Sequence, residues 1–370
     1  MSRARDKITA MVFCTLVLAG AISEIVIKDK YYSEKEKREL TQIPTINKET
    51  IYSGQLSNDL EKYLADQFPI RDGLVSTKTI TETIFGKKES NNVYFSADGY
   101  LIDAFKSYDK NLAERNINAV KKLSDELSQR DISFKVMLIP TQAQILKDKL
   151  PAFAPNLDQN EIINYAKSQG LDVTDVSKIL DEHKDEYIYY KTDHHYTSLG
   201  AYYCYKAYRE SIGKKCDDIS AWKSETLSND FRGTTYNKVN YPLAGYDAIT
   251  AYYKNISHTV TYNDSYTTDS IYERKFLQGA DKYAVFFNSN QAKTVVNGEG
   301  NGRLLIIKDS YANELAQFAV DDHEQTHMID LRFFKGSVSE YIKENDINEV
   351  LVCYNVPNFV KDKSVSRCCM

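Results

Sequence analysis

Apolar residues follow two different spacings in the middle and C-terminal parts of the chain. Val120, Leu123 and Leu127 recur at the spacing of one helix face, whereas 134–139 and 304–307 are largely continuous apolar runs. Such runs are typical of strands buried on both faces of a parallel sheet. Further elements are predicted as a hairpin at 91–102, strands at 171–173, 283–287, 328–332 and 350–353, and a helix at 197–207. This alternation predicts an α/β fold with a mostly parallel sheet.

The first 30 residues have the pattern of a membrane-targeting segment. Three basic residues, Arg3, Arg5 and Lys7, precede an apolar run at 8–22. The run is short for a membrane span, which needs about 20 residues, and long enough for the core of a signal peptide. Residues 1–30 are therefore predicted to be a signal anchor or a cleaved signal peptide. Either way the rest of the chain is expected outside the cytoplasm, anchored at the cell membrane or secreted after cleavage.

The pattern of polar residues divides the rest of the chain. Residues 31–90 contain a charge run and an amphipathic helix at 56–68, and are predicted to form a membrane-proximal stalk and a layer leading into the main domain. Residues 91–360 are predicted to form that main domain. Within it, the polar, tyrosine-rich stretch 214–281 indicates an insertion that could act as a lid or a wall of the substrate site. The polar tail at 361–370 is predicted to be disordered.

Composition and charge narrow the classes of function. The chain has 370 residues, a formal net charge of -5 and no basic stripe, which argues against nucleic-acid binding. It contains 28 tyrosines and one tryptophan. Tyrosines could line a saccharide groove, because each offers a flat apolar face and a hydroxyl, or could simply fill strands and half-buried faces. The six cysteines have no metal-type spacing and do not define a disulfide pairing.

The first candidate for chemistry is the run Asp193, His194 and His195. In an extended segment, residues i and i+2 point to the same side, so Asp193 can hold the imidazole of His195 while His194 points away. A carboxylate in that position fixes the tautomer of a histidine that acts as a general base. The same side chains could instead ligate zinc or manganese, or form a polar, partly buried loop. The motif alone leaves these three interpretations open.

The second candidate is Ser310, which follows the strand predicted at 304–307. Its hydroxyl is expected at the carboxyl end of the sheet, where ligands bind in α/β proteins. Backbone N–H groups at the start of the following helix, those of Ser310 and Tyr311, would suit an oxyanion. A serine in this position can also be an ordinary helix cap. Arg332, after a later strand, could position a polar or anionic substrate in the same pocket or form a surface salt bridge.

Several blocks of the chain resemble, in order, the bacterial DHHW protein family. The segment 190–203 resembles the motif that gives the family its name, with Tyr196 where tryptophan is usual. The further blocks that carry the resemblance are 33–40, 66–72, the turn at Gly233 and Thr234, 308–313 and 329–332. The likeness covers most of the chain after residue 30.

That family is similar to the alginate O-acetyltransferases of the AlgJ and AlgX type, which have an SGNH-hydrolase-like fold. The resemblance implies a three-layer SGNH-hydrolase-like fold for this chain. It also implies that Ser310 is the nucleophile, His195 the base and Asp193 the acid that orients the base. Arg332 would lie near the substrate, and Asn290 would donate a hydrogen bond to the oxyanion.

The implied activity is that of an extracytoplasmic O-acetyltransferase or acetylesterase on a cell-surface or exported polysaccharide. No cofactor and no metal is expected for it. Because a transferase outside the membrane needs an acyl donor delivered across it, a multispanning membrane acyltransferase is predicted as a partner. Because Tyr196 replaces the tryptophan that is usual in the family, any substrate contact made by that tryptophan is not carried over to this chain. Asp193 and His195 match the family motif.

Two other functions stay open. Metal-dependent phosphoesterases also use an Asp-His-His motif, although this chain has no early Asp-x-Asp on a strand that would complete a two-metal site. A non-catalytic polysaccharide-binding surface protein could keep the same scaffold and use its tyrosines as sugar contacts.

Overall fold

The computed structural model describes residues 2–33, 38–69, 71–254 and 256–369, so residues 34–37 of the predicted charge run lie outside the described part. The chain forms two compact units. The smaller one contains Met1–Lys87 together with Asn237–Leu243, and the larger one contains Lys88–Tyr236 and Ala244–Met370. The division at Lys87 lies close to the boundary placed at residue 90 from the sequence.

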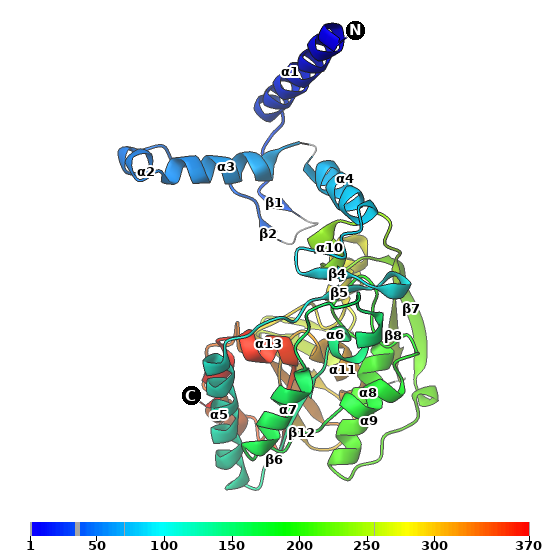
Figure 1. The fold of residues 1–370 in the computed structure, drawn as a ribbon. Coiled ribbons are helices and arrows are strands. Elements are labelled where there is room, and N and C mark those ends of the chain that lie inside the picture. The colour runs from blue at the N-terminus through cyan, green and yellow to red at the C-terminus, as the bar shows by residue number, and fades with distance from the viewer. Residues whose placement is uncertain (1, 34–37, 70, 255, 370) are drawn as a thin grey trace. The chain divides into compact units, whose positions relative to one another are not determined.

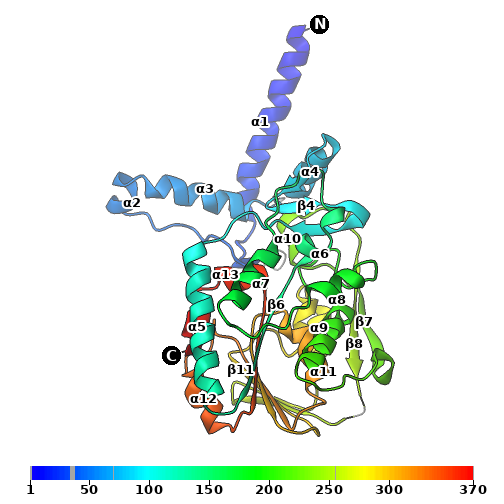
Figure 2. The ribbon, with the colours of Figure 1, turned by 60° about the horizontal axis from the view of Figure 1, so that its bottom comes forward.

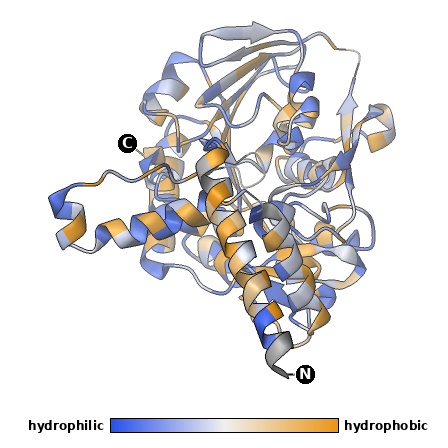
Figure 3. Ribbon diagram, turned by 90° about the horizontal axis from the view of Figure 1, so that it is seen from above, coloured by the Kyte–Doolittle hydropathy of each residue, from blue (hydrophilic) through white to orange (hydrophobic). Residues whose placement is uncertain are grey.

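The smaller unit is built mostly from helices. Its first helix, α1 (Ser2–Val26), contains a window, Asp6–Ser23, that is long and apolar enough to cross a membrane, a property that signal sequences share. Figure 3 shows hydrophobic residues along most of this helix. The remaining elements of the unit are β1 (Tyr32–Ser33), β2 (Arg38–Glu39), α2 (Lys48–Tyr52), α3 (Gln55–Gln67) and α4 (Arg71–Ile84). The helix predicted at 56–68 is thus confirmed as α3.

The larger unit is organised around a seven-stranded mixed sheet with the strand order β10-β9-β11-β13-β12-β14-β6. Strands β13, β12, β14 and β6 run parallel to one another, while β11, β9 and β10 pair antiparallel at one edge. The prediction of a mostly parallel sheet is therefore correct only for one half of the sheet. The strands of this sheet are β6 (Ser133–Ile139), β9 (Thr259–Tyr262), β10 (Tyr266–Thr268), β11 (Lys293–Asn297), β12 (Arg303–Lys308), β13 (Gln325–Ile329) and β14 (Glu349–Asn355).

Helices cover both faces of this sheet (Figures 1 and 2). Along β12, Leu304 and Ile306 join one hydrophobic core, and Leu305 and Ile307 join the other, as the alternation of a strand requires. The first core includes residues of α9 (Ser198–Ser211) and α11 (Ala312–Ala319), and the second includes residues of α5 (Lys110–Ser128), α12 (Val338–Glu344) and α13 (Val356–Lys361). Because both faces are buried, the continuous apolar runs of the sequence are explained.

Shorter elements complete the larger unit. The hairpin predicted at 91–102 is present, since β4 pairs antiparallel with β5. The elements not yet given are β3 (Glu89–Ser90), β4 (Val93–Phe95), β5 (Leu101–Asp103), α6 (Gln142–Ile145), α7 (Gln159–Ser168), α8 (Ser177–Glu182), β7 (Lys223–Phe231) and β8 (Asp247–Tyr253), with 3-10 helices at Ala97–Gly99, Lys147–Lys149, Ile219–Ala221, Arg274–Gln278, Lys282–Val285 and Val365–Cys369. Helix α10 (Thr234–Val239) begins in the larger unit, and its residues from Asn237 on belong to the smaller one.

The stretch 214–281 is not a separate insertion along its whole length. Strands β7 and β8 form a two-stranded antiparallel ribbon of their own, but β9 and β10 extend the central sheet. The polar composition misled the prediction because β9 alternates buried and less buried positions and the edge strand β10 has no buried residue, so neither contains a continuous apolar run.

Two further predictions are wrong. Residues 283–287 are not a strand; they lie in and after the 3-10 helix Lys282–Val285, and the left-handed backbone of Phe287, Asn288 and Ser289 turns the chain toward β11 instead. The tail at 361–370 is not disordered over its described residues. It forms the 3-10 helix Val365–Cys369, where Val365 and Cys368 are buried in the core that contains α5.

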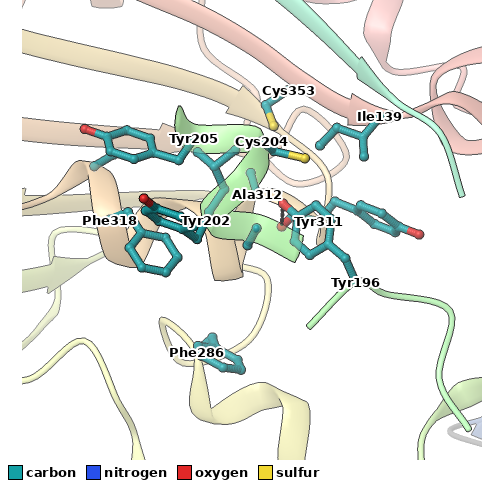
Figure 4. Close-up of a cluster of buried hydrophobic side chains, with 14 of the residues drawn as sticks. Ile139, Tyr196, Tyr202, Cys204, Tyr205, Phe286, Tyr311, Ala312, Phe318 and Cys353 are labelled. Carbon is teal, nitrogen blue, oxygen red and sulfur yellow. Dashed lines mark hydrogen bonds between the residues drawn. The ribbon is translucent and has the colours of Figure 1, made fainter. Parts of the chain in front are cut away.

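Most of the large buried side chains of the first core are aromatic. Figure 4 shows Tyr202, Tyr205 and Phe318 gathered together, with Tyr196 and Tyr311 further along the same cluster. The hydroxyl of Tyr196 donates to the carbonyl of Tyr311 at 2.7 Å. Many of the tyrosines therefore fill the interior, and a buried hydroxyl with a partner is how tyrosine is accommodated there.

Candidate active site

Ser310 lies in the turn between β12 and α11, beyond the carboxyl end of a central parallel strand. The preceding carboxylate, Asp309, holds this turn. Its Oδ1 accepts the N–H of Tyr311 at 2.9 Å, and its Oδ2 accepts donors from Asn355 at 3.1 and 2.8 Å and from Asn358 at 2.8 Å. The conformation around Ser310 is therefore fixed from two neighbouring segments, the turn itself and the start of α13.

The segment that carries Asp193 and His195 approaches the serine from the side of α9. The amide of Gln142 donates to the carbonyls of Tyr190 and Asp193 at 2.6 and 2.7 Å, which holds the segment against α6. Nδ1 of His195 lies 2.5 Å from Oδ1 of Asp193, and Nε2 lies 2.8 Å from Oγ of Ser310. The sequence-predicted trio is thus brought into one continuous hydrogen-bonded chain.

Burial increases along that chain. Ser310 retains 8% of its surface, His195 3% and Asp193 1%, so Ser310 is the most exposed of the three residues. This gradient suits a site in which a reactant reaches the serine while the carboxylate stays away from water.

Asp193 has donors on both oxygens. In addition to the imidazole, the N–H of His195 donates to Oδ1 at 3.0 Å, and the N–H and hydroxyl of Thr234 donate to Oδ2 at 2.7 and 3.0 Å. Burial by itself would raise the pKa of Asp193, but the adjacent His195 and His194 and these hydrogen bonds outweigh it, so the pKa is well below its usual range. The carboxylate is therefore ionised and can support a charged imidazole.

Two aromatic rings flank His195. The ring of Tyr283 stacks on the imidazole with a centroid distance of 3.8 Å and an interplanar angle of 8°, and its hydroxyl donates to the carbonyl of Ser310 at 3.0 Å. His194 does not point clear of the site as expected. Its ring centroid lies 3.8 Å from that of His195, and its Nδ1 contacts the hydroxyl of Thr234 at 2.5 Å.

The three other predicted residues have different outcomes. The N–H of Tyr311 donates to Oδ1 of Asp309 at 2.9 Å in this arrangement, so its role as an oxyanion donor stays a prediction. The amide oxygen of Asn290 accepts from Lys308 at 3.1 Å, and no contact in the described part of the chain joins it to Ser310. Arg332 forms a two-point pair with Asp330, with its Nε 2.9 Å from Oδ1 and Nη2 2.5 Å from Oδ2.

A lysine charge next to the site is also buried. Burial lowers the pKa of Lys308 from 10.5 to about 8, partly opposed by the attraction of Asp330. Lys308 and Arg332 therefore both lie close enough to the Asp330 carboxylate to be attracted by its negative charge. Arg332 is held beside the carboxyl ends of β12 and β13, although the described contacts include none between it and Ser310, His195 or Asp193.

Sequence reasoning missed Thr234 as a partner of Asp193, and Tyr283 as a partner of both His195 and Ser310. It also missed the reason for Gly233: a Cβ on this residue would lie 2.1 Å from Oδ2 of Asp193, so only glycine fits there. The turn at Gly233 and Thr234 was noted as a family block, which was the available signal for two of these residues. Nothing in the local pattern pointed to Tyr283.

A metal interpretation can be tested on the same atoms. Asp193, His194 and His195 each offer a ligand atom, and these atoms lie within 4.8 Å of one another. However, both nitrogens of His195 and both oxygens of Asp193 already have hydrogen-bond partners. An ion held by all three would have to displace those partners, so the arrangement fits a hydrogen-bonded chain better than a metal centre.

The fold and the site define an α/β protein that presents a serine, linked through histidine to a buried carboxylate, at the carboxyl edge of its sheet. The sequence profile of the DHHW protein family matches residues 88–329, and the chain belongs to this family. No curated protein matches the chain by sequence.

The first two of the following solved structures share this fold. A DHHW family protein from Eubacterium siraeum is 25% identical, with a TM-score of 0.63 over 75% of this chain and 95% of that one. PatB1 from Bacillus cereus is 22% identical, with a TM-score of 0.62 over 72% of this chain and 97% of that one, and it has also been solved with a sulfonyl adduct. The O-acetyltransferase domain of Pseudomonas putida AlgJ is 14% identical, with a TM-score of 0.49 over 73% of this chain and 94% of that one.

Proposed function

We propose that this protein is a serine-dependent O-acetyltransferase or acetylesterase that acts on a polysaccharide outside the cytoplasm. The observation that carries the proposal is the hydrogen-bonded chain from Ser310 through His195 to Asp193. Acyl transfer by serine requires a base at hydrogen-bond distance from the hydroxyl and a group that orients that base.

The reaction divides into two half-reactions. Nε2 of His195 accepts the proton of the Ser310 hydroxyl as Oγ attacks the acetyl carbonyl. The tetrahedral adduct collapses, the bond to the leaving oxygen or sulfur breaks, and His195 returns the proton to it. A sugar hydroxyl or a water then gives its proton to His195 and attacks the acetyl-serine. As this second tetrahedral adduct collapses, the bond to Oγ of Ser310 breaks and His195 returns the proton to Oγ, which regenerates both residues. Asp193 stabilises the imidazolium that exists in each half-reaction.

The oxyanion would be held mainly by the N–H of Ser310. Within the described part of the chain this N–H has no hydrogen-bond acceptor, whereas the N–H of Tyr311 is taken by Asp309. A donor aimed at the developing negative charge contributes more in a water-poor site than in bulk solvent. Asn290 and Arg332 remain proposals as substrate contacts, and Arg332 would act through a guanidinium already fixed by Asp330.

The acetyl group and the carbohydrate acceptor are proposed from the resemblance of the sequence blocks to alginate O-acetyltransferases. The apolar helix α1 supports an extracytoplasmic location, either as a membrane anchor or as a signal peptide. A transferase in that location needs activated acetyl groups from inside the cell, so a multispanning membrane acyltransferase is proposed as the partner that supplies them.

The experiment that tests the serine is turnover of a chromogenic acetyl ester by the full-length chain in detergent. The wild type should turn over, Ser310→Ala should lose activity to background, and Ser168→Ala, which changes an exposed serine at the end of α7, should match the wild type. Labelling with a phenylmethylsulfonyl fluoride reagent should modify the wild type at Ser310, as located by mass spectrometry of the modified peptide. Equal turnover in all three proteins, or a label on another residue, would refute the proposal.

A further inference from the structure

A second concave site lies on the larger unit away from Ser310. It is a pocket of about 310 Å³ bordered by β8, by the chain on either side of β9 and β10, and by the C-terminal part of α11. We call it the Asp321 pocket, and the residues used in the argument are Tyr252, Tyr253, His258, Arg274, Gln317 and Asp321. Its volume falls in the lower part of the range for small-molecule sites.

A buried carboxylate on the wall of the pocket is only half satisfied. Nε2 of His258 lies 2.9 Å from Oδ1 of Asp321, whose side chain is 2% exposed. Oδ2 of Asp321 is buried and has no hydrogen-bond partner among the described residues. A buried acceptor without a partner costs free energy, so the pocket favours a ligand that brings a hydrogen-bond donor.

Tyrosine faces and hydroxyls make up much of the rest of the wall. The hydroxyl of Tyr272 is engaged with the carbonyl of Tyr252 at 2.6 Å and with Oε1 of Gln317 at 3.0 Å. In contrast, the described residues contain no hydrogen-bond partner for the hydroxyls of Tyr252 and Tyr253. Adjacent residues of a strand point to opposite faces, and the ring of Tyr252 packs against Phe318 at a centroid distance of 5.8 Å. Tyr253 therefore offers the flat apolar face, and Tyr252 offers its hydroxyl.

The charges at the pocket are largely matched. Arg274 makes a two-point pair with Glu225 at 2.8 and 2.6 Å, and Lys254 pairs with Asp217 at 2.9 Å. No unpaired cation is left among these groups to attract a phosphate or carboxylate. An uncharged ligand with many hydroxyls matches this combination of a carboxylate acceptor, hydroxyls and aromatic faces.

We propose that the Asp321 pocket is a saccharide-binding site that holds one or two neutral sugar units of a glycan. A sugar hydroxyl would donate to Oδ2 of Asp321, the ring face of Tyr253 would contact the C–H face of the sugar, and the hydroxyl of Tyr252 would form a hydrogen bond with it. The site differs from the serine site: Ser310 precedes α11 and Asp321 follows it, and the eight residues of α11 rise about 12 Å.

The inference does not depend on the proposed acetyl chemistry. A polysaccharide-binding site of this kind would serve either a catalytic or a non-catalytic surface protein. It gives part of the tyrosine-rich stretch at 214–281 a role that the filling of the interior does not explain.

The test is isothermal titration calorimetry of the full-length chain in detergent with three soluble probes: maltohexaose, cellohexaose and chitohexaose. At least one probe should bind, Asp321→Asn should weaken its affinity about tenfold, and Tyr252→Phe should weaken it about threefold to tenfold. Tyr266→Phe, which changes an exposed tyrosine outside the pocket, is the matched control and should bind like the wild type. Tyr252→Phe keeps the test valid if Asp321→Asn fails to fold, since no hydrogen bond of the Tyr252 hydroxyl is lost.

The tryptophan of the chain reports where the probe binds. Trp222 is the only tryptophan in the sequence, and Nζ of Lys254, which borders the pocket, lies 4.3 Å from the centre of its ring. A saturable change in its fluorescence should follow the calorimetric isotherm. The absence of binding for all three probes, or wild-type affinity in both pocket variants, would overturn the inference. Weaker binding by Ser310→Ala instead would place the sugar at the serine and would also overturn it.

Discussion

A histidine paired with an aspartate lies near each end of helix α11, and the two pairs are arranged differently. At the start of the helix, His195 uses Nδ1 to contact Asp193 and keeps Nε2 for the hydroxyl of Ser310. After its end, His258 uses Nε2 to contact Asp321. The first carboxylate has donors on both oxygens, whereas the second has an oxygen without a partner among the described residues.

This difference indicates which features matter for function. A His–Asp pair is common in proteins, and what the remaining polar atoms contact decides its chemistry. A fully satisfied carboxylate orients a base toward a nucleophile. A half-satisfied carboxylate beside a pocket is suited to accept a hydrogen bond from a ligand. The first arrangement predicts turnover and the second predicts binding.

The largest effect should come from removing the charge of the first pair. Asp193→Asn should lower ester turnover by roughly three to four orders of magnitude, because the amide no longer holds His195 in the tautomer that accepts the serine proton. The measurement is kcat on a chromogenic acetyl ester. Asp181→Asn, an exposed aspartate on α8, should behave as wild type. A comparable loss in Asp321→Asn would break the contrast between the two pairs.

A steric change at the first pair should have the next largest effect. A Cβ at Gly233 would lie 2.1 Å from Oδ2 and 2.3 Å from Cβ of Asp193, so Gly233→Ala should displace the carboxylate and lower turnover about a hundredfold. Gly245→Ala is the matched control, since a Cβ there would meet nothing within 4 Å. Wild-type turnover in Gly233→Ala would mean that the position of the Asp193 carboxylate does not matter for catalysis. That result would contradict the proposal that Asp193 orients His195.

How far the sequence predicted this site depends on whether a residue acts locally. The strand before Ser310 and the turn after it follow from a continuous apolar run, and the pairing of Asp193 with His195 follows from their spacing. The strand could be predicted because its apolar run is visible in the sequence, and the pairing because Asp193 and His195 are only two positions apart. The hydrogen bonds from Thr234 could not, since they join residues 41 positions apart.

The same reasoning explains the errors in the fold. Strand β9 alternates buried and less buried residues and the edge strand β10 has no buried residue, so their stretch resembled a polar insertion. The left-handed backbone at Phe287, Asn288 and Ser289 converts an apolar run into a turn, which no periodicity reveals. Tyr283, which precedes that turn, was therefore placed on a strand and its contact with His195 was missed.

The free energy of unfolding should depend on pH through Lys308, the buried lysine next to the first pair. Near the second pair, Lys254 and Arg274 are both in ion pairs. Burial lowers the pKa of Lys308 from 10.5 to about 8, so between these values the unfolded chain binds more protons than the folded chain. The free energy of unfolding should therefore rise with pH from about 8 to 10.5, by at most about 3 kcal/mol.

The measurement is urea unfolding across this pH range for the wild type and for Lys308→Met. The difference in stability between the two proteins should move in favour of the wild type as the pH rises, whichever is more stable at pH 7. Lys178→Met, which changes an 87% exposed side chain, should show no such trend relative to the wild type. A constant difference for Lys308→Met would show that Lys308 stays charged in the folded protein.

The smallest effect should come from removing the hydroxyl of Tyr283, whose ring lies against the histidine of the first pair. Tyr283 stacks on His195 and donates to the carbonyl of Ser310, while His258 has no stacked ring among the described residues. We expect Tyr283 to be a positioning residue. Tyr283→Phe keeps the ring and removes only the hydrogen bond, so kcat should fall about threefold to tenfold with little change in KM.

Tyr283→Leu removes the stack as well, and should lower kcat further and shift the pH at which activity rises, because the ring packs directly on the imidazole that must change its charge. Tyr165→Phe, at an exposed position on α7, should leave both quantities as in the wild type. If Tyr283→Leu lost stability but kept the wild-type pH profile and kcat, the ring would only fill space. The orientation of His195 would then rest on Asp193 alone, and the two His–Asp pairs would differ only in what their histidine and carboxylate contact.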